Sequence, residues 1–427
     1  MKRLFLYIVL IANLGECLYA QTSSQNYIVT TVPTQAVSNP AVLTDDGSSS
    51  ANAITTIEYF DGLGRSSQTV QKAITPTSAD LVSGIEYYDP FGQVYRHWLP
   101  GKVAANSGAY VTDFSTPSAN TNGGDSKPYV TTEYDGSPLN RVTGQSGPGV
   151  DWYNNNKKKT IAYTTNGSNV KYFYVEGTQL KCNSTYTSAT LYGQKTTDED
   201  GKTVEEFTDK QGRKVLSRMT DAVTGNHDTY YVYDDLGNLR YVLPPMAADA
   251  LGTDTDGFGE GTNTPLDQYG YIYHYDDLKR CTEKKLPGCK PILMVYDLAD
   301  RLVALQDGNQ KLNGQWTVNK YDVFNRPLYS FITTNTQAQI TSALGSNPIN
   351  ETLGTDNLTG GYTLTGNIPV TAMLTVNYYD SYSFIPVGNN LNYDSSQEQN
   401  GYTAQYGNAK GLLTGTRVYH LDNPSLF

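Results

Sequence analysis

The stretch Tyr231–Pro245, YVYDDLGNLRYVLPP, contains the pattern that decides the fold. Aromatic residues alternate with other side chains up to Tyr233, as in a half-buried β-strand, and a second apolar run begins after Asn238. Between the two runs, Asp234 can accept hydrogen bonds from the backbone N–H groups of a turn. Gly237 is the residue type that best tolerates a positive φ. The segment is therefore predicted to be a β-hairpin with a four- or five-residue connection.

The same pattern recurs along most of the chain. Each copy has a strand ending in an aromatic residue, then Asp, two residues, a turn residue, usually a cation, and a second strand. The copies are EYFDGLGRSSQTV (58–70), EYYDPFGQVYRHWLP (86–100), EYDGSPLNRV (133–142), EFTDKQGRKVLSR (206–218), YVYDDLGNLRYVLPP (231–245), YHYDDLKRCTEKKLPG (273–288), MVYDLADRLVALQDG (294–308) and NKYDVFNRPLYSFI (319–332). A fainter copy begins at Val376.

The spacing of the copies predicts an array rather than a globular enzyme. The closest equivalent aspartates are 21 to 28 residues apart, a period typical of repeat architectures. A single hairpin cannot bury its apolar face, so successive hairpins must pair into one sheet. The predicted fold class is all-β: an array of antiparallel hairpins that forms a curved, open sheet or partial β-shell. The segment 131–332 is expected to be one such extended sheet with an open C-terminal edge.

Each position of the turn has a predicted structural role. The acidic residue accepts turn hydrogen bonds, the third residue after it adopts a positive φ, and the following Arg pairs with that acid or with one in a neighbouring hairpin. The predicted acceptors are Asp61, Asp89, Asp209, Asp234, Asp276, Asp297 and Asp322. The predicted positive-φ glycines are Gly64, Gly92, Gly212 and Gly237, and the predicted pairing arginines are Arg65, Arg213, Arg280, Arg301 and Arg326. Tyr231 and Tyr233 are expected to share one face of the wall.

Composition agrees with this fold and argues against nucleic-acid binding. The chain has 427 residues with a net charge of −11, which would repel a phosphate backbone. Its 35 tyrosines and abundant Thr favour pleated surfaces, while Gly and Asn favour turns. Most tyrosines are expected to fill and cross-link the sheet. A subset facing outward can bind glycans or a partner protein.

The N-terminus has the parts of a secretory signal peptide. Met1–Arg3 is positive, residues 4–14 are apolar, and Ala20 offers a small residue for cleavage. Export places the mature chain in an oxidising compartment, secreted or at the cell surface. There, Cys281 and Cys289 form either a local disulfide or two free thiols. The predicted organisation is signal peptide 1–20, N-terminal β-rich domain 21–130, hairpin array 131–332 and β-rich continuation 333–427, with no later membrane span.

Candidate chemistry is sparse. The pairs Asp234–Asp235 and Asp276–Asp277 can in principle act as acid and base, but they recur at a turn position that should be solvated. The loop GTDTDGFGEG (252–261) carries acidic residues without EF-hand spacing. The four histidines (His97, His227, His274 and His420) are scattered, and no nucleophile elbow or phosphate-binding loop is present. We therefore predict no enzyme activity, catalytic residues, cofactor or metal.

The copies resemble YD repeats of the RHS family, whose core is Tyr-Asp-x-x-Gly-Arg-[Leu/Val]. The opening TTIEYFDGLGRSSQTV is similar to the N-terminal region of Bacteroidetes-type RHS proteins. The resemblance implies a hollow β-shell that encloses a C-terminal toxin, with a self-cleaving core between the two. The chain ends at RVYHLDNPSLF without that core or a toxin, which implies a truncated N-terminal portion. Its implied partners are the rest of the shell and the toxin.

Two functions remain open from the sequence. The first is a non-enzymatic exported scaffold, part of a shell that helps to deliver a toxin encoded further on. The alternative is a cell-surface adhesin that binds carbohydrate or protein through a Tyr-rich β-surface. An open sheet edge is prone to pair with other chains, so the isolated chain is expected to self-associate.

Overall fold

The computed structural model describes residues 22, 24–34, 53–88, 92–261, 263–345, 348–384 and 409–420. The chain divides into two compact units. The described part of the first consists of residues 22–164 and 194–204, and that of the second of residues 165–193, 205–384 and 409–420.

The first unit is a ladder of antiparallel strands in which most strands pair with a neighbour in sequence. Its strands are β1 (Asn26–Pro33), β2 (Ala53–Phe60), β3 (Ser66–Lys72), β4 (Asp80–Tyr88), β5 (Gln93–Trp98), β6 (Gly101–Val103), β7 (Tyr129–Tyr134), β8 (Val142–Ser146), β9 (Lys159–Thr165) and β12 (Tyr192–Thr197). The order β1–β2–β3–β4 continues from β4 to both β5 and β6. From β5 it runs through β7 and β8 to β9, which also pairs with β12.

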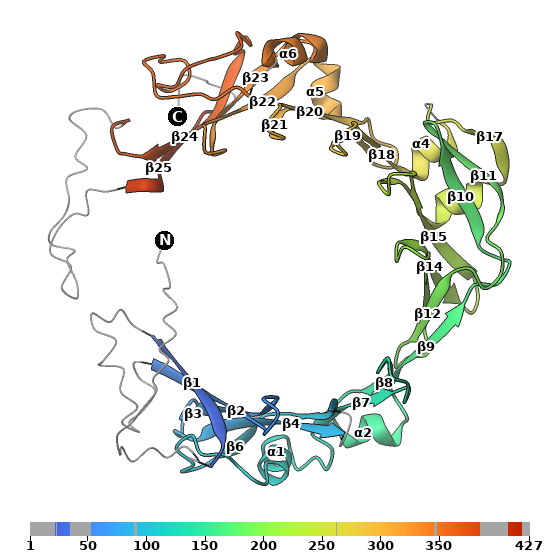
Figure 1. Cartoon of the computed structure of the whole chain (residues 1–427), viewed down its shortest axis with the longest axis vertical. Coiled ribbons are helices and arrows are strands. Elements are labelled where there is room, and N and C mark those ends of the chain that lie inside the picture. The colour runs from blue at the N-terminus through green and yellow to red at the C-terminus, as the bar shows by residue number, and fades with distance from the viewer. Residues whose placement is uncertain are drawn as a thin grey trace. The chain divides into compact units, whose positions relative to one another are not determined.

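The second unit continues the same arrangement. Its strands are β13 (Thr203–Thr208), β14 (Lys214–Asp221), β15 (Gly225–Tyr233), β16 (Leu239–Leu243), β18 (Tyr271–Tyr275), β19 (Cys281–Lys285), β20 (Ile292–Tyr296), β21 (Leu302–Gln306), β22 (Trp316–Tyr321), β23 (Pro327–Thr333), β24 (Ala372–Asp380) and β25 (Ala409–Val418). From β14 to β25 each strand pairs antiparallel with the next in this order (Figure 1).

The predicted fold class is confirmed: the chain is an open, all-β array of antiparallel hairpins. Among the described residues, β1 pairs only with β2 and β25 only with β24, so the sheet does not close on itself. Most hairpins also carry a β-bulge just after the turn. In the Asp297 hairpin, Tyr296 faces Leu302 while Val295 faces Ala304, which leaves Val303 as the extra residue. Such bulges increase local twist and re-aim side chains.

A second sheet, which the sequence did not predict, lies in the second unit. It consists of β10 (Lys171–Glu176), β11 (Gln179–Thr185) and β17 (Asp254–Phe258). Strand β17 comes from the glycine-rich loop at 252–261 and pairs with β11, so this loop is not only a solvated insertion. Helices α3 (Pro245–Ala250) and α4 (Pro265–Tyr269) precede and follow β17, and α3 contacts β15 and β16.

The apolar cores lie where the sheet is covered. One core packs the second sheet and α3 against β14–β18, with Leu180, Tyr241 and Ile272 nearly inaccessible. Another joins β20–β24 to α6 (Gln337–Leu344) and the loop that follows it. A smaller one holds Ile57, Tyr59, Val70 and Val82 in the first unit. The array therefore gains its stability by covering one face of the hairpins, as antiparallel sheets commonly do.

The remaining helices are short and occupy connections. They are α1 (Ser115–Thr121), α2 (Val150–Asn154) and α5 (Gly308–Leu312). Capping boxes fix the starts of α5 at Asp307 and of α6 at Thr336. None of the described helices is long and apolar enough to cross a membrane. The predicted signal peptide lies outside the described residues, and the predicted domain boundaries at 130 and 332 stay predictions.

Candidate functional site: aspartate turns linked by arginine and tyrosine

The turn at Asp297 shows the geometry of the repeat. The backbone N–H of Asp297 donates to the carbonyl of Arg301 (3.1 Å), and the N–H of Asp300 donates to the carbonyl of Asp297 (3.2 Å). The carboxylate oxygen Oδ1 of Asp297 accepts the N–H groups of Ala299 (2.9 Å) and Arg301 (3.0 Å). The aspartate thus satisfies the donors of its own turn, as the sequence predicted.

The same four bonds recur in the other described turns of this length. They are present at Asp61, Asp209, Asp234, Asp276 and Asp322. The third residue after each aspartate has a positive φ: Gly64, Gly212, Gly237, Lys279, Asp300 and Asn325. Lys279 is unfavourable there, because a side chain with a Cβ costs free energy in the left-handed region. Asp89 lies outside the described residues, while Gly92 has a φ of 68°.

The other carboxylate oxygen binds the arginine that ends the turn. The Nε–Oδ2 distances are 2.6–2.8 Å for Arg65, Arg213, Arg280, Arg301 and Arg326 with their aspartates. At Asp234 the arginine is replaced by Asn238, whose Nδ2 donates to Oδ2 at 3.0 Å. The geometry therefore matches the predicted Asp–Arg pairs in every described copy that contains them.

Each arginine also reaches the next hairpin, which the sequence indicated only in general terms. The guanidinium lies over the ring of a tyrosine in that hairpin, with Cζ-to-centroid distances of 4.4–5.2 Å. These pairs are Arg65–Tyr87, Arg213–Tyr233, Arg280–Tyr296, Arg301–Tyr321 and Arg326–Tyr379. A cation over an aromatic face is attractive. The arginine is thus held by its own turn and by its neighbour at the same time.

The tyrosine of the next hairpin returns the contact through its hydroxyl. Tyr233 donates to the carbonyl of Lys214 (3.0 Å), Tyr275 to that of Leu239 (3.0 Å) and Tyr321 to that of Leu302 (2.8 Å). Each acceptor is the first residue after the turn of the preceding hairpin. The same bond forms for Tyr87, Tyr134, Tyr163, Tyr296 and Tyr379. We call this chain of contacts the Asp–Arg–Tyr ladder.

The ladder is most buried around Arg301. The side chains of Arg301 and Asp297 are 6 % and 1 % exposed, and Nη2 of Arg301 is 2.6 Å from Oδ2 of Asp297. The guanidinium also donates to the carbonyls of Asp322 (3.1 Å) and Ile349 (2.8 Å). A buried charge needs this degree of pairing, because desolvation is costly.

Electrostatics keep Tyr275 protonated and Asp276 and Asp380 ionised near neutral pH. Burial raises the pKa of Tyr275 to about 12, so its hydroxyl stays a donor. Burial opposes ionisation of Asp276, but the backbone and side-chain hydrogen bonds of Arg280 outweigh it and lower the pKa of Asp276. The side-chain hydrogen bonds from Arg326 lower the pKa of Asp380 to about 2.

The paired carboxylates are not arranged as an acid and a base. Both oxygens of Asp234 accept hydrogen bonds within its own turn, and Asp235 is exposed. Likewise, both oxygens of Asp276 accept hydrogen bonds within its own turn, and Asp277 is exposed. The geometry therefore gives Asp234 and Asp276 a structural role as hydrogen-bond acceptors of their own turns.

The sequence missed one further turn, at Asp198. Its N–H donates to the carbonyl of Lys202 (2.9 Å), and its Oδ1 accepts the N–H groups of Asp200 and Lys202. Gly201 has a φ of 82°. The stretch DEDGK keeps the acid, glycine and cation, but Thr197 stands where the tyrosine would be. A search for Asp-x-x-Gly-[Lys/Arg] without the aromatic residue would have found it.

Of the two alternatives for Cys281 and Cys289, the disulfide is wrong. Both are free thiols, as is Cys182. Cys281 begins strand β19, whereas Cys289 belongs to the turn beyond its far end, where its N–H donates to Leu286. Four strand steps of about 3.3 Å separate the two ends of β19. A disulfide needs Cα atoms within roughly 7 Å, so the strand holds the thiols apart.

The acidic loop at 252–261 has a structural role. Glu260 accepts hydrogen bonds from the hydroxyl of Tyr241 (2.5 Å) and lies 3.0 Å from Nε2 of His274. Burial opposes its ionisation, but hydrogen bonds from these two residues and the charge of His274 lower the pKa of Glu260. Within the described ranges, no group of three or more His, Cys, Asp or Glu side chains is placed to hold a metal ion.

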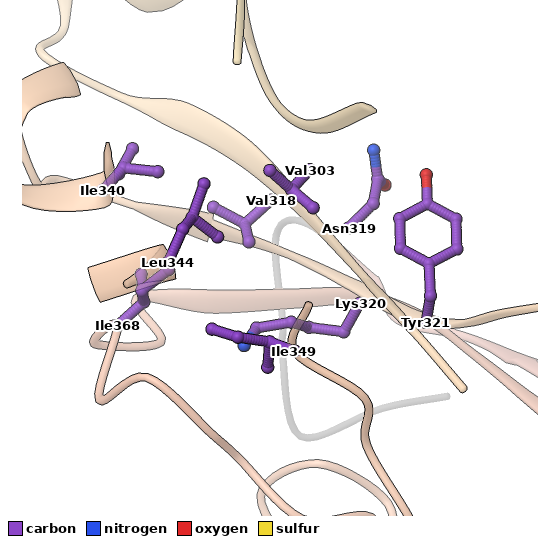
Figure 2. A pocket seen from close by; sticks show the side chains of 9 residues that line it. All are labelled: Val303, Val318, Asn319, Lys320, Tyr321, Ile340, Leu344, Ile349 and Ile368. Carbon is purple, nitrogen blue, oxygen red and sulfur yellow. The ribbon is translucent and has the colours of Figure 1, made fainter. Parts of the chain in front are cut away.

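A small pocket lies between β21, β22 and α6 (Figure 2). Val303 and Val318 line it from the strands, and Ile340 and Leu344 line it from the helix. Its cavity volume is about 10 Å³, about the minimum that one water molecule needs. Beside it, Lys320 and Glu351 form a buried ion pair at 2.9 Å. The pocket is a packing gap of the second core.

Comparison with known proteins gives one family match. Residues 29–165 match a family described as "Domain of unknown function (DUF6443)". This range ends beside residue 164, the last of the first unit's continuous segment. No curated protein matches the chain. The match covers less than half of the chain, and its description names no activity.

Several solved structures resemble the fold. A crystal structure described as TcdB2-TccC3-TEV has 12 % identity and a TM-score of 0.48, and the match covers 87 % of this chain and 15 % of that one. TcdB2-TccC3 without its hypervariable C-terminal region has 15 % identity, a TM-score of 0.46 and coverage of 77 % and 14 %. The Photorhabdus luminescens Tc holotoxin pore with the mutation TccC3-D651A has 12 % identity and a TM-score of 0.48, and the match covers 83 % of this chain and 14 % of that one.

These comparisons concern fold alone. The chain spans only 14–15 % of the length of the three solved chains. At a coarse level, an RHS-like relation agrees with the repeated Tyr-Asp turns and the open hairpin array. The assignment to a Bacteroidetes type and the truncation before a core and toxin stay predictions.

Proposed function

We propose that this chain is a non-enzymatic, exported scaffold that forms part of a β-wall around a cargo domain encoded beyond it. The observation that carries the proposal is the Asp–Arg–Tyr ladder. In it, an ion pair fixes the arginine within its own turn, and a cation–π contact and a hydroxyl–carbonyl bond join that turn to the next hairpin, with Arg301 as the most buried member. Repetition of such links can extend a wall hairpin by hairpin.

The placement of polar groups supports a scaffold over an enzyme. The repeated carboxylates accept hydrogen bonds from the donors of their own turns, and the described pocket is small and mostly apolar. Steric enclosure needs no reacting group, only a sheet whose neighbouring hairpins cannot separate. Export follows from the predicted signal peptide. N-terminal sequencing of protein recovered outside the cytoplasm should begin at Gln21.

The test of enclosure is protection of the cargo from protease. The chain is produced with the polypeptide encoded immediately after it, and cleavage of that polypeptide is compared with its cleavage alone. We expect cleavage at least about a hundredfold slower in the assembly. The double variant Arg280→Ala/Arg301→Ala should restore fast cleavage by opening the ladder. The exposed turn variant Lys210→Ala should not.

Two results would contradict enclosure. One is cleavage of the cargo at its free rate in the assembly with the unaltered wall. The other is a stop codon followed by unrelated genes, because the wall would then have no cargo.

A second function, binding as a surface adhesin, is favoured by one specific observation. Tyr172 and Tyr174 lie stacked on the second sheet, and Tyr172 is 38 % exposed; neither belongs to the Asp–Arg–Tyr ladder. Adhesion and enclosure use different surfaces, so each can be tested separately.

A further inference from the structure

Each compact unit has one end strand that pairs on a single side among the described strands, and the two end strands differ in shape. In the first unit, β1 pairs with β2 through eight consecutive residue pairs without a register shift. In the second unit, β25 pairs with β24 across two register shifts. Bulges twist an edge strand away from the geometry that another strand needs. Of the two, β1 therefore presents the straight edge.

The two end strands also differ in charge. The sequence of β1, NYIVTTVP, contains no charged residue. Strand β25 contains Lys410 and Arg417, and Lys410 is exposed. Lysine on an edge strand is a common device against edge-to-edge pairing. The edge at β25 is thus protected by bulges and by charge, whereas β1 has only Pro33, at its last position.

The core of the first unit holds β1 in position. Val29 packs against that core, and the ring of Tyr27 lies 5.7 Å from that of the buried Tyr59. Ile28 lies on the other face of the strand and is 48 % exposed. Because β1 is already extended and anchored, pairing with a further strand requires little additional ordering.

The backbone of an open edge selects its partner. Its N–H and C=O groups lie in a row at strand spacing, so another β-strand fits them best. Pairing of a strand with its own copy adds a condition, because any charge would be brought close to a like charge. Strand β1 meets this condition. Between its first and last residues it consists only of aromatic and β-branched side chains, which pair well across strands.

From these observations we infer that β1 is a homodimer interface, at which the β1 strands of two copies pair antiparallel about a two-fold axis. The core faces of both copies lie on one side of the joined sheet only if each residue meets one on the same face of its strand. An axis through Thr30 satisfies this condition, and it pairs the exposed Ile28 with Val32 of the second copy. The inference goes beyond both proposed functions and depends on neither.

Sedimentation equilibrium of the chain from Gln21 onward, at about 1–100 µM, tests the inference. We expect a reversible dimer that tightens as salt is added, because both copies carry a negative net charge. Ile28→Lys/Thr30→Lys places like charges across the axis and should weaken the dimer at least about tenfold. Leu413→Lys is the matched control. Leu413 is a 56 % exposed residue of β25, so its replacement should leave the dimer unchanged.

A disulfide tests the register in a chain whose exposed Cys289 is replaced by serine. With the axis at Thr30, the two Thr30 Cα atoms lie about 4.5–5.5 Å apart, which suits a disulfide. Thr30→Cys should therefore give a covalent dimer on oxidation. Thr56→Cys is the control, because Thr56 faces Thr30 within one copy. The two Thr56 positions are three strand spacings apart, about 14 Å, and should not cross-link.

Four results would overturn the inference. They are a monomer at about 100 µM, a dimer that survives both lysines in β1, a dimer that Leu413→Lys dissociates, and a dimer that Thr30→Cys does not cross-link. Protection of the cargo is separate from all four, because Arg280 and Arg301, whose replacement tests it, lie in the second unit.

Discussion

The guanidinium of Arg301 lies 5.2 Å from the centre of the Tyr321 ring, which belongs to the next hairpin. The same guanidinium binds Asp297 in its own turn. One side chain therefore closes a turn and joins two hairpins. The consequence is that a change at this position should affect the sheet beyond the turn itself.

We expect Arg301→Ala to lower the free energy of unfolding of the second unit by about 3–5 kcal/mol, because it leaves the buried Asp297 charge without its partner. Urea unfolding followed by the fluorescence of Trp316, which lies in β22, measures this directly. Trp98 and Trp152 are replaced by Phe in the background so that only the second unit reports.

Arg65→Ala is the matched comparison, with Trp98 as its reporter. Arg65 makes the same ion pair and cation–π contact without the extra carbonyl bonds of Arg301, and its side chain is 33 % exposed, so the loss should be about 0–1 kcal/mol. Equal losses at Arg65 and Arg301 would show that burial does not set the strength of the ladder.

Removing one tyrosine hydroxyl should cost less than removing an arginine. Tyr275→Phe deletes the bond from the hydroxyl to the carbonyl of Leu239 and keeps the ring. The expected loss is about 1 kcal/mol, the net contribution of a typical hydrogen bond. The control is Tyr192→Phe, at an exposed ring, which should leave the urea midpoint unchanged. If Tyr275→Phe left the free energy of unfolding unchanged, the hydroxyl–carbonyl bonds would contribute nothing to the stability of the ladder beyond the ring contacts.

The ladder can be completed where the chain departs from it. Asn238 stands in place of the arginine, and among the described residues no guanidinium lies over the ring of Tyr275. Asn238→Arg should add about 1 kcal/mol to stability by supplying an ion pair to Asp234 and a cation over Tyr275. Asn238→Lys lacks the planar fork and should gain less. If Asn238→Arg lowered the stability instead, the conclusion would be that Lys279, whose amine donates to the carbonyl of Leu236, opposes a second cation between these two hairpins.

Stability should fall on acidification below about pH 4. The side-chain hydrogen bond from Arg141 lowers the pKa of Asp135 to about 2, from an ordinary 3.8, and Arg326 does the same for Asp380. A depressed carboxylate pKa stabilises the fold above the unfolded pKa, and this contribution is lost as pH falls from about 4 to about 2. Urea midpoints at pH 5, 4, 3 and 2 test this. Asp135→Asn should make the curve shallower, and an unchanged slope would remove Asp135 from the explanation.

The local part of the structure was predictable from the sequence. Asp234, Gly237 and their equivalents could be assigned because a turn is decided by four or five adjacent residues. Repetition then separated a structural aspartate from a catalytic one. The arginine partner within the turn was also local. Its stacking on a tyrosine such as Tyr321 depends on strand register, which no single hairpin determines.

Longer-range features were not predictable. Strand β17 pairs with β11, where Leu180 faces Phe258 across a long separation in sequence. The glycine-rich stretch around β17 therefore looked like a solvated loop. The same limit applied to Cys281 and Cys289, whose short spacing suggested a bridge until the intervening strand was placed. The turn at Asp198 was missed because no aromatic residue stands at either of the two positions before the aspartate, whereas Phe207 still marks the copy at Asp209.

The hairpins of the second unit have two unlike margins. Between β15 and β23 the aspartate turns keep one fixed length, whereas the opposite ends carry connections that range from the Pro287–Gly288 turn to segments with α3, α4, β17 or α5. Within this chain, the length of the connections thus varies along one border of the hairpins and stays constant along the other. For protein engineering, this makes the variable border the place to graft a foreign domain, and the invariant border the one to leave untouched.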